Sequence, residues 1–492
     1  MLFGQIVITG IVMHSFESLI QVASLIHNTE PESRTQGELP VLDKYTGEIL
    51  ASVDYIDKVQ MEEAIESSLA GFEVLRKMTT GERRNLLKNF YSLIQKNKQA
   101  LTDLVVAEAG KPIGYAAVEV ERTLSTLEHS IEHIRTFGGE QVPMDFDGGV
   151  GKSAMTKRFP KGVIACISPF NFPLNLAMHK IAPAIAVGCS VLLKPSPFTP
   201  LTALALANLA VEAGFPAGAF NVVIAENEVS QMMIEDERIA HLSFTGSPSV
   251  GWMLKNICGK KSVTLELGGN AAVIVDETAD LQQAAELVAN GAYLFAGQIC
   301  ISTQRIFVAS SVYDDFKDRL IVAMEKIKVG DPRKAENTVG PLIDKVHFQR
   351  INSWVKEAIS NGAHLLSGGK PLDENHNLYQ PTLLENVNRE QKVCCEEVFG
   401  PVAVLNRFQT FQEAIDEVNN SRFGLQAGVF TNDIGRMKAA FEALEVGGVM
   451  INNVPGFRID HMPYGGVKDS GLGREGTRYV MEEFTEPRLL IF

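Results

Sequence analysis

One cysteine and two further residues supply the groups that covalent catalysis requires. Cys300 follows Gly297 and small or apolar neighbours, which let an electrophile approach the sulfur, and a thiolate is a strong nucleophile near neutral pH. Asn171, in the apolar loop 168–173, can donate hydrogen bonds to an oxyanion that forms only in the transition state. Glu266 lies between apolar residues and a glycine pair, where burial raises the pKa of a carboxyl toward the range that a general base needs.

Each of these residues also has an ordinary structural explanation. A lone cysteine in a reducing compartment is more often a buried, inert side chain, Asn171 could occupy a turn, and Glu266 could be a solvated carboxylate. A fourth segment, residues 396–401, combines two acidic residues with Phe399 and a turn, and a strand end explains it equally well. Only the presence of all four segments in one order favours catalysis.

Together the four segments resemble the aldehyde dehydrogenase superfamily, and the resemblance extends from about Val41 to the C-terminus. Further matching motifs are Phe244-Thr245-Gly246-Ser247 and Pro463-Tyr464-Gly465-Gly466-Val467-Lys468-Asp469-Ser470-Gly471. So many ordered matches are far more specific than a lone glycine motif. The resemblance implies an α/β fold with two Rossmann-like parallel-sheet domains, one cofactor-binding and one catalytic, and a small β oligomerisation arm.

The resemblance also implies a role for each matching residue. The nucleophile falls on Cys300, the oxyanion amide on Asn171 and the general base on Glu266, while Lys180 and Glu475 match a proton-relay pair. The expected cofactor contacts lie in the loop after the first apolar strand, after the next strand, and in the later motifs. They are Ser168, Phe170, Asn171, Lys194, Ser196, Gly246, Ser247, Leu267, Glu397 and Phe399.

The cofactor-binding pattern departs from common ones in two ways. The strand-linked Gly-x-Gly-x-x-Gly signature is missing from the first apolar series, so the resemblance implies instead a pyrophosphate at the helix start near Ser247. Many NAD-preferring members carry a glutamate three positions after the residue that Lys194 matches, whereas this chain has Pro197. Because no carboxylate there repels a 2′-phosphate, we expect use of both NAD and NADP, with NAD slightly favoured.

The implied reaction is oxidation of an aldehyde to its carboxylate through a thiohemiacetal and a thioester on Cys300. Members that transfer the acyl group to coenzyme A characteristically lack the glutamate, so Glu266 favours hydrolysis. A non-catalytic structural protein on the same scaffold, or a module that binds only a nucleotide, would need neither residue. These two alternatives from other classes are therefore not favoured.

The segment 454–462 resembles the lactaldehyde and semialdehyde branch of the superfamily, whose substrates are small and hydroxylated or anionic. Arg458 and His461 in this segment, and Arg122 in a helical segment, are candidate substrate contacts. Each could equally be a salt-bridged surface residue. We expect a small polar or anionic aldehyde of this type, with succinate semialdehyde as the alternative substrate.

Composition limits the possible partners. At 492 residues and 53.8 kDa the chain should form two or more compact units. The net charge of −14 and the pI near 5.3 disfavour nucleic acid or an anionic membrane as the main partner. Six cysteines without a CxxC or Cys/His spacing predict neither a disulfide framework nor a metal site, and indicate the reducing cytoplasm. The expected partner is therefore a small-molecule aldehyde.

The first residues do not resemble a targeting signal. The apolar run from Met1 to Met13 lacks a basic start and a cleavage site, and it is shorter than the roughly 20 residues that a membrane span requires. We expect no signal peptide. Residues 1–40 are predicted to be a poorly ordered extension, unless translation starts at Met13.

Alternating helix and strand patterns position the candidate residues. Apolar spacing predicts exterior helices over 59–76 and, after a capped start at Thr79, over 83–96. Buried parallel strands are predicted at 162–167, 190–194 and 220–223, with a second series from 271–275 followed by a helix over 279–295.

We predict three units from these patterns and the resemblance. The cofactor-binding domain comprises residues 41–137 and 157–267, and the catalytic domain comprises 268–470. A hairpin near 138–156 and an apolar strand in 471–492 form the oligomerisation arm, which implies a homodimer or homotetramer.

Overall fold

Short apolar segments form a six-stranded sheet within residues 16–32 and 37–492, which the computed structural model describes. The strand order is β21-β9-β8-β5-β6-β7; β21 is antiparallel to β9 and the other pairs are parallel. The predicted strands at 162–167, 190–194 and 220–223 are confirmed. The six strands are β5 (Val163–Ile167), β6 (Ser190–Lys194), β7 (Phe220–Val222), β8 (Ile239–Thr245), β9 (Ser262–Glu266) and β21 (Gly471–Leu472).

Helices cover both faces of this sheet because successive side chains of a strand point to opposite sides. Ile164 and Cys166 pack with one layer, formed by α2 (Thr80–Lys96), α3 (Lys98–Ala109), α4 (Ile113–His133), α5 (Asn175–Val187), α6 (Pro200–Glu212) and α15 (Thr477–Glu483). Val163 and Ala165 pack with the other, formed by α1 (Lys58–Leu75), α7 (Asn227–Glu235) and α8 (Pro248–Ile257). Thr79 and Glu82 form a capping box at the start of α2, as predicted.

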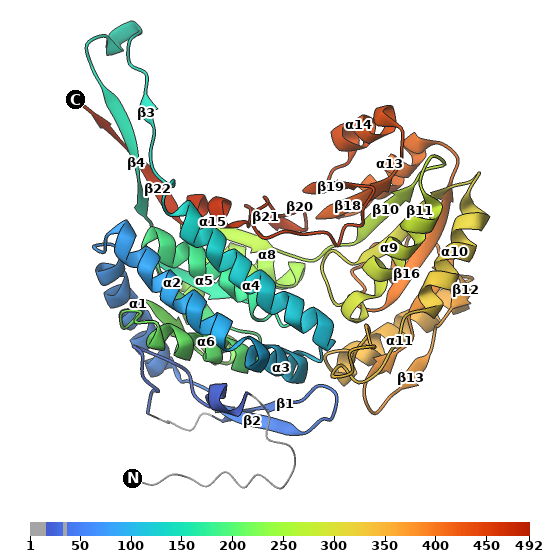
Figure 1. Cartoon of the computed structure of the whole chain (residues 1–492), viewed down its shortest axis with the longest axis horizontal. Coiled ribbons are helices and arrows are strands. Elements are labelled where there is room, and N and C mark those ends of the chain that lie inside the picture. The colour runs from blue at the N-terminus through green and yellow to red at the C-terminus, as the bar shows by residue number, and fades with distance from the viewer. Residues whose placement is uncertain (1–15, 33–36) are drawn as a thin grey trace.

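A seven-stranded sheet forms the second unit, at the right of Figure 1, in the order β12-β15-β16-β11-β10-β18-β19. All pairs are parallel except β12 with β15. Its strands are β10 (Ala271–Val275), β11 (Thr303–Ala309), β12 (His364–Ser367), β15 (Thr382–Glu385), β16 (Val402–Phe408), β18 (Gln426–Phe430) and β19 (Gly448–Ile451).

Two helical layers also enclose this second sheet. One core contains residues of α9 (Leu281–Tyr293), α10 (Tyr313–Glu325), α11 (Lys345–Ser360) and α12 (Lys392–Cys395), and the other those of α13 (Phe411–Asn419) and α14 (Ile434–Ala443). Residues 267–270 link β9 of the first sheet directly to β10 of the second. The α/β class with two Rossmann-like sheets is therefore confirmed.

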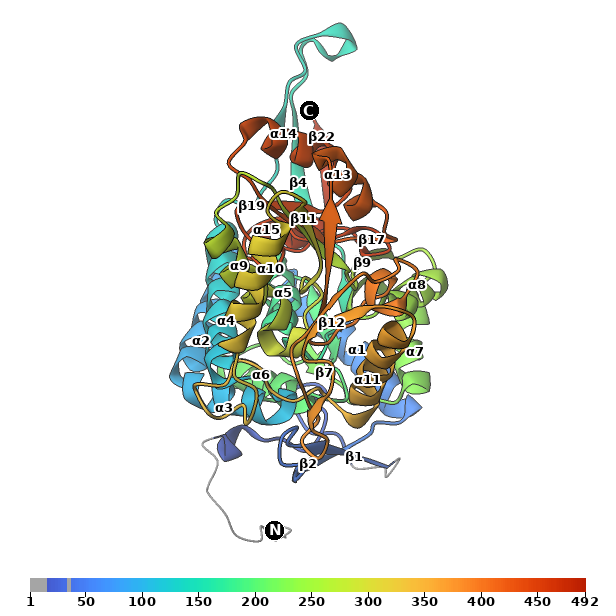
Figure 2. The same ribbon diagram turned by 90° about the vertical axis from the view of Figure 1, so that its right-hand side faces the viewer.

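An arm projects away from both sheets, as Figures 1 and 2 show. It is a three-stranded antiparallel sheet of β3 (Gln141–Val142), β4 (Ala154–Pro160) and β22 (Thr485–Ile491). The predicted arm bounds need two corrections. β4 continues to Pro160, past the predicted end of the hairpin at residue 156, and residues 471–472 form β21 in the six-stranded sheet, while α15 packs on α5. Only the last strand of the predicted segment 471–492 belongs to the arm.

The N-terminal segment is more ordered than predicted where it is described. Phe16 and Leu19 are buried in the core of the first unit, and Leu25 exchanges backbone hydrogen bonds with Val222 of β7 at 2.8 and 2.9 Å. Apolar contacts thus hold residues 16–32 on the domain, which corrects the prediction for that part of residues 1–40. The apolar run up to Met13 and the alternative start there lie outside the described residues.

Short elements complete the described chain: β1 (Glu38–Leu42) with β2 (Ile49–Asp54), β13 (Pro371–Asp373) with β14 (Leu378–Tyr379), β17 (Phe423–Gly424) with β20 (Val467–Lys468), and the 3-10 turns Glu17–Leu19, Asp147–Gly149 and Leu294–Gly297. All six cysteines are free thiols. Among the described helices, none is long and apolar enough to cross a membrane.

Candidate active site

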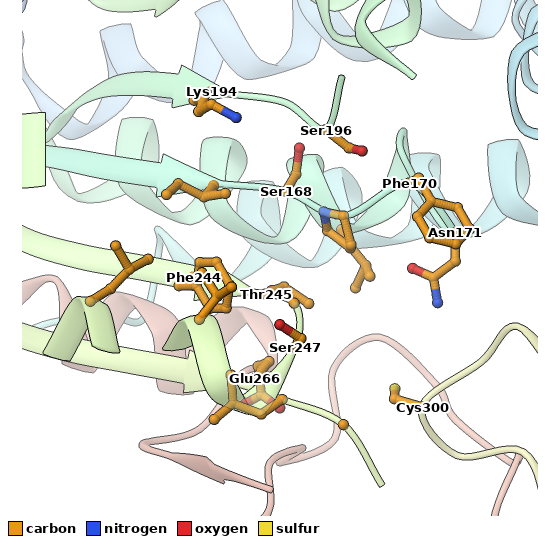
Figure 3. A pocket seen from close by; sticks show the side chains of 18 of the residues that line it. Ser168, Phe170, Asn171, Lys194, Ser196, Phe244, Thr245, Ser247, Glu266 and Cys300 are labelled. Atoms are coloured by element: carbon orange, nitrogen blue, oxygen red, sulfur yellow. The ribbon is translucent and has the colours of Figure 1, made fainter. Parts of the chain in front are cut away.

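A cavity of about 910 Å³ lies between the two sheets and contains most of the predicted site residues. The six-stranded sheet contributes residues that follow the carboxyl ends of β5, β6, β8 and β9, where open α/β sheets bind ligands. The second unit contributes Cys300, Glu397 and Phe399. Figure 3 shows Cys300 on a separate loop, Asn171 on the segment that follows β5, and Glu266 at the end of β9.

A tight turn after α9 presents Cys300. Phe295, Ala296 and Gly297 all have positive φ angles of 49°, 55° and 68°. A Cβ atom at Gly297 would lie 2.1 Å from the carbonyl oxygen of Gly400, so this position requires glycine. The predicted helix 279–295 is therefore wrong at its last residues, because α9 ends at Tyr293. Burial raises the pKa of the Cys300 thiol to about 12.

The Asn171 side chain joins the loop after β5 to the loop of Cys300. Its Nδ2 donates to the carbonyl oxygen of Gln298 at 3.0 Å, and the side chain of Gln298 in turn contacts Pro341 and Ile343. An amide nitrogen carries two N–H groups, so one of them is left for a substrate oxygen. The residue is 4% exposed, and its Oδ1 has no partner among the described residues.

Glu266 ends β9 and is almost fully buried. Neither of its carboxyl oxygens has a hydrogen-bond partner within the described residues. Burial, and then the nearby charge of Glu475, raise the pKa of Glu266 well above its usual value. An unpaired buried carboxyl that lines a cavity is free to exchange a proton with a water molecule in that cavity.

Lys180 and Glu475 form a buried ion pair beside the cavity. The Nζ of Lys180 lies 3.0 Å from Glu475 and also donates to Ser243. Arg458 donates to the other oxygen of Glu475 at 3.0 Å. Burial alone would raise the pKa of Glu475, but Lys180 and Arg458 hold it at about 2, so the carboxylate stays ionised.

The same cavity has features that suit a dinucleotide. Ser168 and Thr245 line it with hydroxyls that have no partner among the described residues, and Lys194 is buried at the end of β6. As predicted, a helix starts after Ser247: α8 begins at Pro248, and Ser247 is its N-cap. The backbone N–H groups of that first turn can bind phosphate oxygens.

The remaining predicted cofactor residues line the same space. Phe170 contacts Phe399 edge to face, with ring centroids 5.7 Å apart. Glu397 accepts a hydrogen bond from Gly269 at 3.0 Å, and burial raises the pKa of its carboxyl to about 7. Ser196, Gly246 and Leu267 are also part of the lining. These residues, with the unpaired hydroxyls, fit a nicotinamide dinucleotide.

The three candidate substrate residues do not share one position. Arg458 lines the cavity. Arg122 lies outside the described lining and forms a two-point ion pair with Asp460, at 2.7 and 3.2 Å. His461 also lies outside it, with its ring packed on His129 of α4 at a centroid distance of 4.8 Å. The structure therefore does not bring these two predicted residues into the cavity: Arg122, on α4, is paired with Asp460, and His461 packs against the same helix.

Two residues of the site carried no predicted role. The hydroxyl of Tyr464 lies 3.1 Å from the sulfur of Cys300. Asn270 donates to the carbonyl oxygens of Cys394 and Glu396, both at 2.9 Å, and thereby fixes the loop that carries Glu397. Tyr464 lies inside a motif that matches the family, and its phenol hydroxyl in that motif was the signal that could have identified it. Nothing in the sequence links Asn270 to residue 394.

Comparison with known proteins gives one consistent answer. Residues 31–490 match the aldehyde dehydrogenase family. The chain is 40% identical to a 3-sulfolactaldehyde dehydrogenase of Priestia megaterium over 479 residues, which cover 96% of this chain and 99% of that protein.

Solved structures agree with this result. The crystal structure of aldehyde dehydrogenase 21 from Physcomitrella patens, in complex with the reaction product succinate, has a TM-score of 0.92 at 37% identity and covers 96% of this chain and 98% of that one. A glyceraldehyde-3-phosphate dehydrogenase from Methanocaldococcus jannaschii, complexed with NADP, has a TM-score of 0.89 at 36% identity and covers 93% and 99%. The chain thus belongs to the aldehyde dehydrogenase family and is an NAD(P)-dependent enzyme that oxidises small aldehydes to acids.

Proposed function

We propose that the substrate is a small aldehyde with a hydroxyl or anionic group, of the lactaldehyde or semialdehyde type. The observation that carries this proposal is Arg458, a cation with a side chain 7% exposed that lines the same cavity as Cys300. Lys180 and Arg458 are two cations that share one ionised carboxylate, Glu475. An anionic or strongly polar group is favoured there.

Succinate semialdehyde is the second candidate. Its support comes from the Physcomitrella patens structure, which contains the reaction product succinate. The Priestia megaterium relative is named for a sulfonated lactaldehyde. Succinate semialdehyde and sulfolactaldehyde both carry an anionic group a few bonds from the carbonyl carbon. The charge at Arg458 suits either one, so only measured selectivity can separate them.

We assign the chemical steps to the residues around Cys300. Its thiolate adds to the carbonyl carbon, and the resulting oxyanion accepts hydrogen bonds from the free N–H of Asn171 and the backbone N–H of Cys300. A bound nicotinamide would accept the hydride that leaves the adduct. Ionised Glu266 then removes a proton from the water that attacks the thioester, and Lys180 with Glu475 provides a route for that proton.

The cofactor proposal is dual use of NAD and NADP, with NAD slightly favoured. Pro197 lines the cavity three positions after Lys194, where it carries no charge to repel a 2′-phosphate. Lys194 and Ser196 lie on the same side and can bind either a ribose hydroxyl or a phosphate.

We further propose a cytoplasmic homodimer or homotetramer. β22 is an edge strand of the arm, and its apolar residues Leu489, Leu490 and Ile491 are exposed. Such an edge invites pairing with a second copy, and six free thiols suit a reducing compartment. Light scattering at micromolar concentration should give a mass of two or four chains; a monodisperse monomer would contradict this assembly.

An aldehyde panel tests the substrate proposal. Initial rates for lactaldehyde, succinate semialdehyde and propanal, each with NAD and NADP, give kcat/KM for a hydroxylated, an anionic and an apolar aldehyde. Arg458→Ala should raise KM for the preferred polar aldehyde roughly ten- to a hundredfold, the effect of one charge-assisted hydrogen bond, and leave propanal almost unchanged.

Arg319→Ala is the control, because Arg319 forms an exposed ion pair with Asp315 on α10 and neither residue lines the cavity. Its KM values should stay within about threefold of the native enzyme. If Arg458→Ala weakens propanal and the polar aldehydes alike, Arg458 supports the fold of the site rather than substrate choice.

A further inference from the structure

The hydroxyl of Tyr464 has one hydrogen-bond partner among the described residues, the sulfur of Cys300 at 3.1 Å. The side chain is buried, with 4% of the residue exposed. Backbone hydrogen bonds between Tyr464 and Glu475, at 3.0 and 2.6 Å, hold the residue from both sides. The contact with Cys300 therefore comes from a fixed backbone position and not from a mobile loop side chain.

Arg458 strengthens this contact. Its guanidinium carbon lies 3.7 Å from the centroid of the Tyr464 ring, within the range of a cation–π interaction. A cation over the ring withdraws electron density from the phenol, so the hydroxyl becomes a better hydrogen-bond donor. Glu475 fixes Arg458 in that place through its 3.0 Å ion pair.

We propose that Tyr464 is a catalytic residue whose hydroxyl donates a hydrogen bond to the Cys300 thiolate and so sets the fraction of enzyme that is ready to attack the aldehyde. The proposal rests on Cys300 as the nucleophile. Ionisation releases the proton of Cys300 to water in the cavity, while Tyr464 keeps its own proton. Burial raises the pKa of Tyr464 well above its usual value, which keeps the phenol neutral and able to donate.

The charged groups around Cys300 explain why this donor matters. Burial and the carboxyls of Glu397 and Glu266 oppose a negative charge on the sulfur, whereas Tyr464 and Arg458 favour it. The pKa of Glu266 is itself raised, so Glu266 opposes the thiolate less than a carboxyl with an ordinary pKa would. Tyr464 is the group among them whose hydroxyl lies within hydrogen-bond distance of the sulfur, and a thiolate has no proton, so toward the ionised sulfur this hydroxyl must be the donor.

The test measures the thiol directly, without an aldehyde. The full-length enzyme is treated with iodoacetamide across a pH series, and mass spectrometry follows alkylation of the Cys300 peptide separately from that of the exposed Cys395. Tyr464→Phe should raise the apparent pKa for alkylation of Cys300 by about one to two pH units, since a hydrogen bond to a charged group is lost. Below that pKa the alkylation rate should fall roughly ten- to a hundredfold.

Tyr293→Phe is the matched control, because Tyr293 is equally buried and its hydroxyl donates to the carbonyl oxygen of Thr382 at 3.1 Å. It should leave the alkylation profile of Cys300 unchanged. If Tyr464→Phe fails to fold, site-specific incorporation of 3-fluorotyrosine at position 464 keeps the shape and strengthens the donor, so the apparent pKa should then decrease.

The proposal is overturned if a folded Tyr464→Phe enzyme has the native alkylation profile, or if fluorination leaves it unchanged. These outcomes do not depend on the choice of aldehyde. If the substrate proposal were wrong, kcat/KM would instead be equal for all aldehydes of the panel, while the alkylation profile of Cys300 would stay as expected.

Discussion

Two buried glutamates in different regions show what separates a structural carboxyl from a reactive one. Glu108, near the end of α3, accepts hydrogen bonds from the backbone N–H groups of Leu201 and Thr202, at 2.9 and 2.8 Å, in the first turn of α6. Glu266 is similarly buried, but neither of its oxygens has a partner among the described residues.

Burial raises the pKa of both carboxyls, so a raised pKa does not identify the reactive one. The difference lies in the donors. Glu108 satisfies N–H groups that a helix start leaves unpaired, whereas Glu266 faces a cavity that can admit water. An unpaired buried polar group is costly, and the proposed role of Glu266 as general base gives a reason for that cost.

Glu266→Gln should give the largest effect. The first turnover needs only Cys300 and Asn171, so a burst of reduced cofactor should remain while steady-state turnover falls roughly 10²- to 10⁴-fold. Stopped-flow absorbance at saturating aldehyde measures both phases. Loss of the burst as well would place Glu266 before hydride transfer, for example in activation of Cys300.

Glu108→Gln should have the opposite profile. An amide N–H would face the N–H groups of α6, so we expect the free energy of unfolding to fall by about 1–3 kcal/mol. Urea denaturation measures this, and kcat of the folded enzyme should stay near the native value. Glu212 is exposed at the end of α6, so Glu212→Gln should change the free energy of unfolding by less than about 0.5 kcal/mol.

Pro197→Glu adds a third kind of carboxyl, exposed at the cofactor end of the cavity. A solvated charge acts weakly, so we expect kcat/KM for NADP to fall roughly tenfold by repulsion of the 2′-phosphate, with NAD almost unaffected. Pro197→Gln has the same shape without the charge and should spare both cofactors. Equal losses for NAD and NADP in the glutamate variant would show that residue 197 does not face the adenine ribose.

The smallest expected effect is on stability as a function of pH. Because the folded-state pKa of Glu266 is raised, its carboxyl favours folding below the unfolded pKa near 4.5, and that contribution is lost as pH rises through the folded pKa. Glu266→Gln cannot ionise, so thermal unfolding should occur at a slightly higher temperature than in the native enzyme at alkaline pH, and not at pH 4. A native enzyme that is the more stable of the two at alkaline pH would contradict the raised pKa.

The raised pKa of Glu266 also predicts how turnover of the native enzyme changes at low pH. Glu266 must be ionised to remove a proton from water, so steady-state rates should fall as pH decreases through its raised pKa.

Local signals were sufficient for predicting the elements and for naming the candidate reactive residues. Apolar runs predicted β5, β6, β7 and β10, because a strand covered on both faces must be apolar throughout. Thr79 and Glu82 predicted the start of α2, since a capping box involves residues only three positions apart. The motifs around Cys300, Glu266 and Asn171 are contiguous, so their resemblance to one family was visible in the sequence.

Only the tertiary structure decided which side chains meet. Arg122 pairs with Asp460, 338 positions away, and Tyr464 contacts Cys300 across 164 positions. Such a contact leaves no periodic pattern in the sequence. It forms because loops from the two sheets converge, and its energy depends on which charges the neighbouring helices already neutralise. The sequence therefore determined the family, the strands and the candidate nucleophile, whereas the position of Arg458 in the cavity, the pairing of Arg122 with Asp460 and the packing of His461 on α4 required the packed molecule.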